Sequence, residues 1–121
     1  MTKDKLDVIF EMQKAFDDSV IQSRGLDVED KEVWIQRKLL AMFSELSEVL
    51  DEVNFKWWKN PKPLQEQKVK EELVDVLHFF VSMCLTMDMT AEELFQMYLE
   101  KNSENFARQQ GKSDKKGYEV K

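Results

Sequence analysis

Apolar residues recur at intervals of three and four along most of the chain, and this spacing predicts helices rather than strands. The third predicted helix is apolar nearly all round, so we expect it in the middle of a bundle, between its own neighbours and a second subunit. Thr90 followed by Glu93 predicts the capped start of the fourth. The four expected helices span approximately residues 4–22, 27 or 30 to 53, 65–87 and 90–108.

Composition agrees with an all-α helical bundle. The 121 residues include only three Gly and two Pro, 42% are hydrophobic and 35% are charged, which suits one globular domain built from long helices. We expect that domain to occupy residues 1–110. The last segment, "GKSDKKGYEVK", is polar and carries two glycines, so residues 111–121 are expected to form a flexible tail unless a ligand orders them.

Charge and cysteine content narrow the classes of function. A formal net charge of −6 argues against general affinity for nucleic acid, because no basic surplus exists to displace counterions. The single Cys84 suits a reducing compartment, and the longest apolar run is too short to span a membrane. The first ten residues do not resemble a signal peptide. We therefore expect a cytoplasmic protein without a membrane partner.

Two groups of acidic residues carry the candidate chemistry. Glu45, Glu48 and Glu52 fall within a narrow arc at the edge of the apolar stripe of the second predicted helix. In "EELVDVLHFF", Glu72 and Asp75 lie one turn apart on a helix with little polar surface. Bringing several bare carboxylates together out of water is costly, because burial and like charge both disfavour their ionised form.

A divalent cation would offset that cost. Mg²⁺ takes oxygen ligands and completes its shell with water and substrate phosphates, so paired acids on two facing helices would suit it. The alternatives are that the acids form a solvated helix face or make salt bridges to Lys56, Lys59 or Lys70. One histidine and one cysteine cannot supply a zinc site that needs two histidines or a thiolate cluster.

Other polar residues could hold a nucleotide. Lys101, Asn105 and Arg108 share one face of the fourth predicted helix and could donate to phosphate oxygens, or form an ordinary exposed polar face. Gln13 stands in the centre of an apolar stripe with Asp17 one turn on, where an amide either satisfies buried backbone or binds the polar edge of a ligand.

The loop motif "FKWWK" places two tryptophans between lysines. Trp57 or Trp58 could stack on a base, and Lys56 or Lys59 could reach phosphate. One of the two indoles could equally close the end of the bundle.

With the paired acids, "MQKAFDD", "FKWWKN", "EELVDVLHFF" and "KNSENFARQ" in this order, the sequence resembles the all-α nucleoside triphosphate pyrophosphatases. It is most similar to the dimeric dUTPase family, in its short bacterial and phage forms, and the similarity spans nearly the whole chain. The resemblance implies a helical homodimer that uses Mg²⁺ to hydrolyse dUTP, and often dUDP, to dUMP. Hydrolysis of dUTP would release pyrophosphate as the second product.

The resemblance also implies residue roles. The metal ligands would be Glu45, Glu48, Glu72 and Asp75, and either Glu45 or Glu48 would activate water. The base would be recognised by Gln13, Asp17 and either Trp57 or Trp58. Asn102 would contact the sugar. The phosphates would be bound by Lys56, Lys59, Lys101, Asn105, Arg108 and Tyr118.

One departure from the family pattern concerns the base. Many relatives carry Asn where Asp17 stands, and an ionised carboxylate cannot donate a hydrogen bond. A second interpretation is therefore a pyrophosphatase for dCTP or a modified nucleotide. A third, from another class, is a non-catalytic helical interaction module whose acids are surface charge.

Overall fold

The structure is a computed structural model that describes residues 2–27 and 30–120. Its helices are α1 (Lys5–Arg24), α2 (Lys31–Glu52), α3 (Glu66–Thr86) and α4 (Ala91–Gln109), and the described residues contain no strand. The all-α fold predicted from the apolar spacing is thus confirmed. The chain divides into two compact units, Met1–Asp88 and Met89–Lys121.

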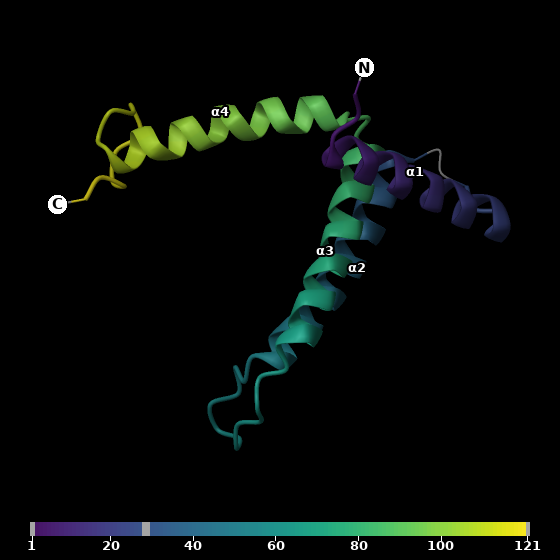
Figure 1. Cartoon of the computed structure of the whole chain (residues 1–121), viewed down its shortest axis with the longest axis horizontal. Coiled ribbons are helices and arrows are strands. Elements are labelled where there is room, and N and C mark those ends of the chain that lie inside the picture. Colours follow the sequence, from purple (N-terminus) through teal and green to yellow (C-terminus); the bar gives the residue numbers. More distant parts are fainter. Residues whose placement is uncertain (1, 28–29, 121) are drawn as a thin grey trace. The chain divides into compact units, whose positions relative to one another are not determined.

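The first unit is built on a helical hairpin. Helices α2 and α3 run side by side in opposite directions, joined by the loop 53–65 at one end (Figure 1). Helix α1 packs against α3 near the other end, where Gln13 and Asp17 contact His78 and Ser82. Helix α3 therefore contacts both other helices of this unit, as its apolar sequence predicts.

Local sequence signals fix the helix ends. Asp4 and Asp7 form a reciprocal capping box at the start of α1, and Gly25 ends that helix with a left-handed φ of 59°. Asp30 Oδ1 accepts from Val33 N at the start of α2. Thr90 caps α4 by accepting from the backbone of the third helical residue. Each such cap is worth about 1 kcal/mol, because it satisfies a backbone donor that has no partner within the helix.

Burial in the first unit concentrates on α1 and on the last turns of α3. Phe10 and Gln13 are the buried residues of α1, and Val81, Ser82 and Cys84 are those of α3. In contrast, the apolar stripe of α2 stays between 38% and 61% exposed, although its spacing is that of a core-facing surface. Its members are Leu39, Phe43, Leu46, Leu50 and Val53. A single copy of the chain does not cover this stripe.

Asn54 holds the α2–α3 loop in place, because its side chain accepts from Lys62 N at 2.9 Å and donates to Lys62 O at 2.8 Å.

Among the described residues no single helix is long and apolar enough to span a membrane. Only α3 and α4 taken together across their break reach that length and composition.

The second unit consists of α4 and the segment that follows it. Glu104 Oε1 accepts from Arg108 Nε at 2.9 Å and from Ser113 Oγ at 2.5 Å, and these donors lower the pKa of the Glu104 carboxyl. The Arg108 guanidinium lies 5.3 Å from the ring centre of Tyr118. The residues after α4 therefore fold back on the last turns of that helix, and Lys121 lies outside the described part.

Candidate functional site

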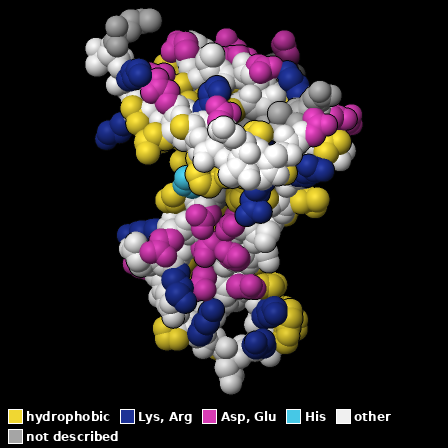
Figure 2. Space-filling view, turned by 90° about the vertical axis from the view of Figure 1, so that its right-hand side faces the viewer, with side chains coloured by type: hydrophobic (Ala, Val, Ile, Leu, Met, Phe, Trp, Pro, Cys, Tyr) yellow, Lys and Arg dark blue, Asp and Glu magenta, His cyan; other side chains and the backbone are white. Residues whose placement is uncertain are grey.

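Carboxylates from α2 and α3 converge in the first unit. Glu45, Glu72 and Asp75 each bring one oxygen to within 4.8 Å of the others. Glu48 belongs to the same group, because its charge acts on both Glu45 and Glu72. Figure 2 shows acidic side chains gathered on one face of the molecule. The structure therefore brings together all four residues expected to bind a metal.

The proximity of these acids changes their acidity. The adjacent Glu48 carboxyl is the main cause that raises the pKa of Glu72 to about 7, and burial is the next. For Glu45, burial comes first and the charges of Glu48 and Asp75 follow, and together they raise its pKa. Both shifts show that the ionised cluster is unfavourable without a compensating positive charge.

Three buried oxygens of these acids lack a hydrogen-bond partner among the described residues. They are Oε2 of Glu45, Glu52 and Glu72. A buried acceptor normally finds a donor, so three orphaned carboxylate oxygens on one hairpin face call for an explanation. A hard divalent cation such as Mg²⁺ requires oxygen ligands, and the acids of the two facing helices supply them. Glu52 is also paired through Oε1 with Lys62 Nζ at 3.7 Å.

The acids continue a stripe of residues along the inner face of the hairpin. On each helix the stripe alternates steps of three and four residues, so its members lie on one side. On α2 it comprises Trp34, Lys38, Ala41, Glu45, Glu48 and Glu52. On α3 it comprises Glu72, Asp75, Phe79, Ser82 and Thr86. Because the helices are antiparallel, the acids occupy the half near the connecting loop and the remaining residues occupy the half near α1.

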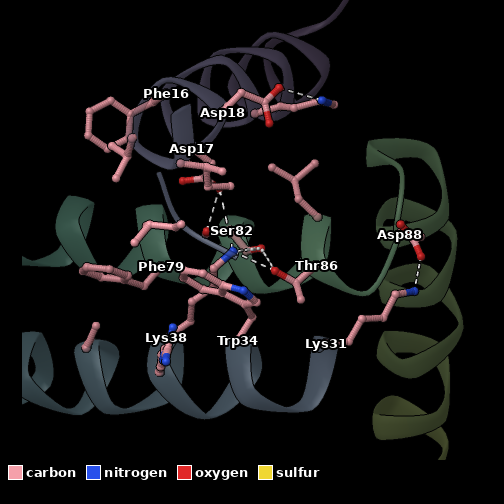
Figure 3. Close-up of a pocket in the computed structure, with 17 residues that line it drawn as sticks. Phe16, Asp17, Asp18, Lys31, Trp34, Lys38, Phe79, Ser82, Thr86 and Asp88 are labelled. Carbon is pink, nitrogen blue, oxygen red and sulfur yellow. Dashed lines mark hydrogen bonds and ion pairs between the residues drawn. The ribbon is translucent and has the colours of Figure 1, made fainter. Parts of the chain in front are cut away.

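That second half of the stripe lines a cavity. The cavity has a volume of about 550 Å³ and is bounded by α1, α2 and α3 (Figure 3). Its aromatic walls come from Phe16, Trp34 and Phe79, and its polar atoms include those of Asp17 and Lys38. Pockets of a few hundred Å³ with mostly apolar walls and a few fixed polar groups are typical of small-ligand sites. The cavity begins one helical turn from the acids, at Ala41 and Phe79.

The residues expected on α1 reach this region. Gln13 Nε2 donates to Asp17 Oδ1 at 2.9 Å, and Gln13 Oε1 lies 2.7 Å from His78 Nδ1. Since an amide oxygen only accepts, His78 Nδ1 is assigned the proton of that contact. Asp17 lines the cavity, whereas Gln13 is buried behind it. The structure thus gives both residues protein partners, and only Asp17 also faces the cavity.

The tryptophan motif lies at the opposite end of the hairpin. Trp57 is 86% exposed and Trp58 62% exposed, and their rings meet edge to face at 5.5 Å. Lys56 lies over the ring of Phe55, and Lys59 donates its backbone N–H to Lys56 O. These four residues are therefore in the loop next to the acid half of the stripe, not in the cavity.

The remaining predicted substrate contacts belong to the second unit. Lys101, Asn102, Asn105 and Arg108 all lie on α4, as the sequence predicts. Arg108 and Tyr118 are brought together by the contact of guanidinium and ring. Lys101 and Asn105 are exposed, and Asn102 is half-buried.

Trp34 and Lys38 line the cavity, although they were not singled out from the sequence. Trp34 donates from Nε1 to Asp27 O at 3.0 Å, and the cations of Arg37 and Lys38 lie 5.1 and 5.8 Å from its ring centre. Lys38 reaches across the hairpin to α3. A signal for both exists in the sequence, because they extend the spacing of Glu45 and Glu48 toward the start of α2.

Comparison with known families identifies the chain. The family model described as dUTPase matches residues 5–93, which cover α1, α2, α3 and the start of α4. The chain belongs to this dUTPase family. The family expected from the ordered motifs is confirmed, and the match includes all four acids together with Gln13, Asp17 and the tryptophan loop.

Individual relatives are phage proteins. A dCTP pyrophosphatase of Enterobacteria phage LZ5 is 34% identical over 74 residues, or 61% of this chain and 43% of that protein. A dCTP pyrophosphatase of Enterobacteria phage T4 is 34% identical over 87 residues, 60% of this chain and 51% of that protein. A DNA replication protein of phage T4 is 32% identical over 80 residues, 54% of this chain but 20% of its own length.

The chain spans about half the length of the dCTP pyrophosphatases that it matches. No solved structure gives a significant match.

Proposed function

We propose that this chain is a nucleoside triphosphate pyrophosphatase that converts dUTP or dCTP to the monophosphate and pyrophosphate. The observation that carries the proposal is the inner stripe of the hairpin. It joins a cluster of carboxylates with orphaned oxygens to a cavity of nucleoside size. A nucleotide whose base enters the cavity would direct its phosphates toward the acids.

The acid cluster fits Mg²⁺. Glu45, Glu48, Glu72 and Asp75 would hold the metal, because their carboxylates converge without enough donors to satisfy them. Bound Mg²⁺ supplies positive charge, which neutralises phosphate oxygens and makes water more acidic. The raised pKa values of Glu45 and Glu72 support this assignment, since they report the charge that a cation would relieve.

The chain's own residues would supply the remaining chemistry. Glu45 or Glu48 would orient the attacking water and accept its proton. The water oxygen bonds to the α-phosphorus as the bond from that phosphorus to the bridging oxygen breaks. Pyrophosphate leaves, and the basic residues proposed to bind phosphate would stabilise its charge. In the first unit these are Lys56 and Lys59 of the α2–α3 loop.

Two bases have support. The family model and the order of the motifs support dUTP. The names of two phage relatives support dCTP, and so does Asp17, because cytosine offers a hydrogen-bond donor where uracil offers an acceptor. Both candidates share the same bond cleavage and the same metal site.

A homodimer is part of this proposal. Large apolar side chains are exposed on both helices of the hairpin: Leu39, Phe43, Leu46, Leu50 and Val53 along α2 and at its end, and Leu73, Val74 and Leu77 on α3. Exposed apolar surface on two neighbouring helices is typical of an interface. A second copy of the chain would bury it by pairing hairpin with hairpin.

Pyrophosphate release across a nucleotide panel tests the proposal. The protein is incubated with dUTP, dCTP, dTTP, dATP and dGTP, with Mg²⁺ or with EDTA. Turnover of dUTP or dCTP that requires Mg²⁺ supports the function. No turnover of any nucleotide, together with a melting temperature that Mg²⁺ leaves unchanged, would favour the non-catalytic interaction module instead.

A further inference from the structure

Lys38 is a cation held inside a polar network that links all three helices of the first unit. Its Nζ donates to Thr86 Oγ1 at 2.7 Å and to Ser82 O at 3.2 Å on α3. The same atom lies 3.9 Å from Asp17 Oδ2 on α1. The side chains of Lys38 and Asp17 are only 16% and 21% exposed. Figure 3 shows them meeting beside Ser82 at the cavity.

Within residues 2–27 and 30–120, every partner of the Asp17 carboxylate is a donor. Gln13 Nε2 donates to Oδ1 at 2.9 Å, Ser82 Oγ donates to Oδ2 at 2.7 Å, and the Lys38 ammonium faces Oδ2. A carboxylate surrounded in this way is held as an acceptor, and each of its oxygens has a further lone pair. Asp17 therefore offers a ligand in the cavity acceptor capacity only.

Acceptor capacity distinguishes the two pyrimidines. Cytosine carries an amino group at C4, which can donate to Asp17, whereas uracil carries a carbonyl oxygen at the same position. Two acceptors facing each other in a partly buried site repel, and neither is satisfied. A site that is built to bind a donor rejects the analogue that lacks it much more strongly than an apolar wall would.

We propose that Lys38 is a positioning residue that sets base selectivity, because its charge holds Asp17 in place as the acceptor for the 4-amino group of cytosine. The inference rests on the proposed function only for the class of ligand, a pyrimidine deoxynucleotide. It names Lys38, which does not itself touch the base, as the residue that decides between cytosine and uracil.

The environment of Lys38 supports a role beyond packing. Burial lowers the pKa of the Lys38 ammonium, while the charge of Asp17 partly opposes that shift. Holding a charge at such a position costs free energy, and an apolar side chain of similar length would fill the same space without that cost. Without the ammonium, Asp17 would be a partly buried charge with neutral partners, and it would turn toward solvent. That movement removes the fixed acceptor.

Binding of the monophosphates tests the inference without turnover. Dissociation constants for dCMP and dUMP are measured by calorimetry in the parental protein, Lys38→Met, Lys38→Arg and Lys31→Met. Lys31 is the matched control, since it lines the same cavity but pairs with exposed Asp88. The parental protein should bind dCMP more tightly than dUMP. In Lys38→Met the ratio of the dUMP dissociation constant to the dCMP dissociation constant should fall about tenfold. Lys38→Arg and Lys31→Met should keep the parental ratio.

Asp17→Asn provides a second variant should Lys38→Met fail to fold. The amide is isosteric and presents a donor, so this variant should shift preference toward dUMP. A parental protein that prefers dUMP or binds both equally overturns the inference. A ratio of the dUMP and dCMP dissociation constants that stays unchanged in folded Lys38→Met also overturns the inference. If Lys38→Met does not fold, an unchanged ratio in folded Asp17→Asn overturns it.

The two proposals fail in distinguishable ways. Selective dCMP binding that depends on Lys38, without Mg²⁺-dependent pyrophosphate release from any nucleotide, would reject only the hydrolase. Mg²⁺-dependent hydrolysis with selectivity that is indifferent to Lys38→Met would reject only the role of Lys38.

Discussion

Glu45 on α2 and Glu72 on α3 approach each other across the hairpin, and each has one buried carboxylate oxygen without a hydrogen-bond partner among the described residues. This relationship is unfavourable for the protein alone, because both groups are disfavoured in their charged form. It becomes favourable once a cation lies between the two helices. The pair therefore links the stability of the hairpin to the proposed metal.

The first prediction concerns pH and the stability of the metal-free protein. The Glu72 pKa is raised from 4.5 to about 7, so between these values the folded protein binds a proton that the unfolded chain has released. Stability in EDTA should accordingly rise as pH falls from about 8 to about 5, and melting curves at several pH values measure it. Glu72→Gln should flatten this dependence, whereas Glu71→Gln should retain it.

Magnesium should reverse the sign of that dependence. A cation binds the ionised carboxylates, so protons compete with it and its stabilising effect is largest above pH 7. Melting temperatures in millimolar Mg²⁺ should exceed those in EDTA by more at pH 8 than at pH 5. An equal effect at both pH values would show that Mg²⁺ does not bind to the raised-pKa acids.

The second prediction separates the tryptophan of the cavity from those of the loop. Trp34→Leu removes the hydrogen bond to Asp27 O and the contacts with two cations, and should lower the free energy of unfolding by about 1–2 kcal/mol. Trp57→Leu removes a side chain that is 86% exposed and should change it by less than about 0.5 kcal/mol. Urea unfolding of the two variants provides the comparison.

The contrast between these tryptophans also shows what the sequence could reveal. The helices, Gly25, the Thr90 cap and the arcs of acids follow from local rules that depend on residues one turn apart. For that reason the acids could be predicted to converge once two helices faced each other. The choice between Asp27 and Asp30 as the start of α2 could not be made locally, and the structure selects Asp30.

The cavity half of the stripe depends on how the helices cross. Lys38 meets Asp17 and Thr86 only because α1 lies against α3 beside the start of α2. A periodic pattern gives the face on which Trp34 and Lys38 stand, but not the element that covers it. The "WW" pair lies in the loop, and the tryptophan that lines the cavity is Trp34 in the first turn of α2.

The third prediction concerns the segment after α4. Glu104 accepts from both Ser113 and Arg108, so Glu104→Ala should release that segment. Trypsin cleavage after Lys112 should become about two- to tenfold faster, because local opening costs less once these bonds are lost. Glu100→Ala, one turn away on α4, is the matched control and should leave the cleavage rate unchanged. Equal rates in the two variants would contradict the prediction.

The fourth prediction concerns the exposed apolar stripe of α2. Phe43→Glu places a charge in its centre and should weaken self-association by at least about tenfold, since a buried unpaired charge costs several kcal/mol. Light scattering at a series of concentrations measures the mass. Ser44→Glu adds the same charge on the same helix outside the stripe and should leave the mass unchanged. A parental protein that is monomeric at all concentrations would reject the homodimer.

The most direct measurement of the central claim is pyrophosphate release by Asp75→Asn. Asp75 supplies one oxygen of the converging cluster, and its replacement by an amide keeps shape and helix while removing a charged ligand. With Mg²⁺ and the nucleotide that the parental protein prefers, turnover should fall at least about 100-fold, with an unchanged helical signal. Glu71→Gln should match the parental rate. Parental turnover by Asp75→Asn would contradict the assignment of the acid cluster as the catalytic metal site.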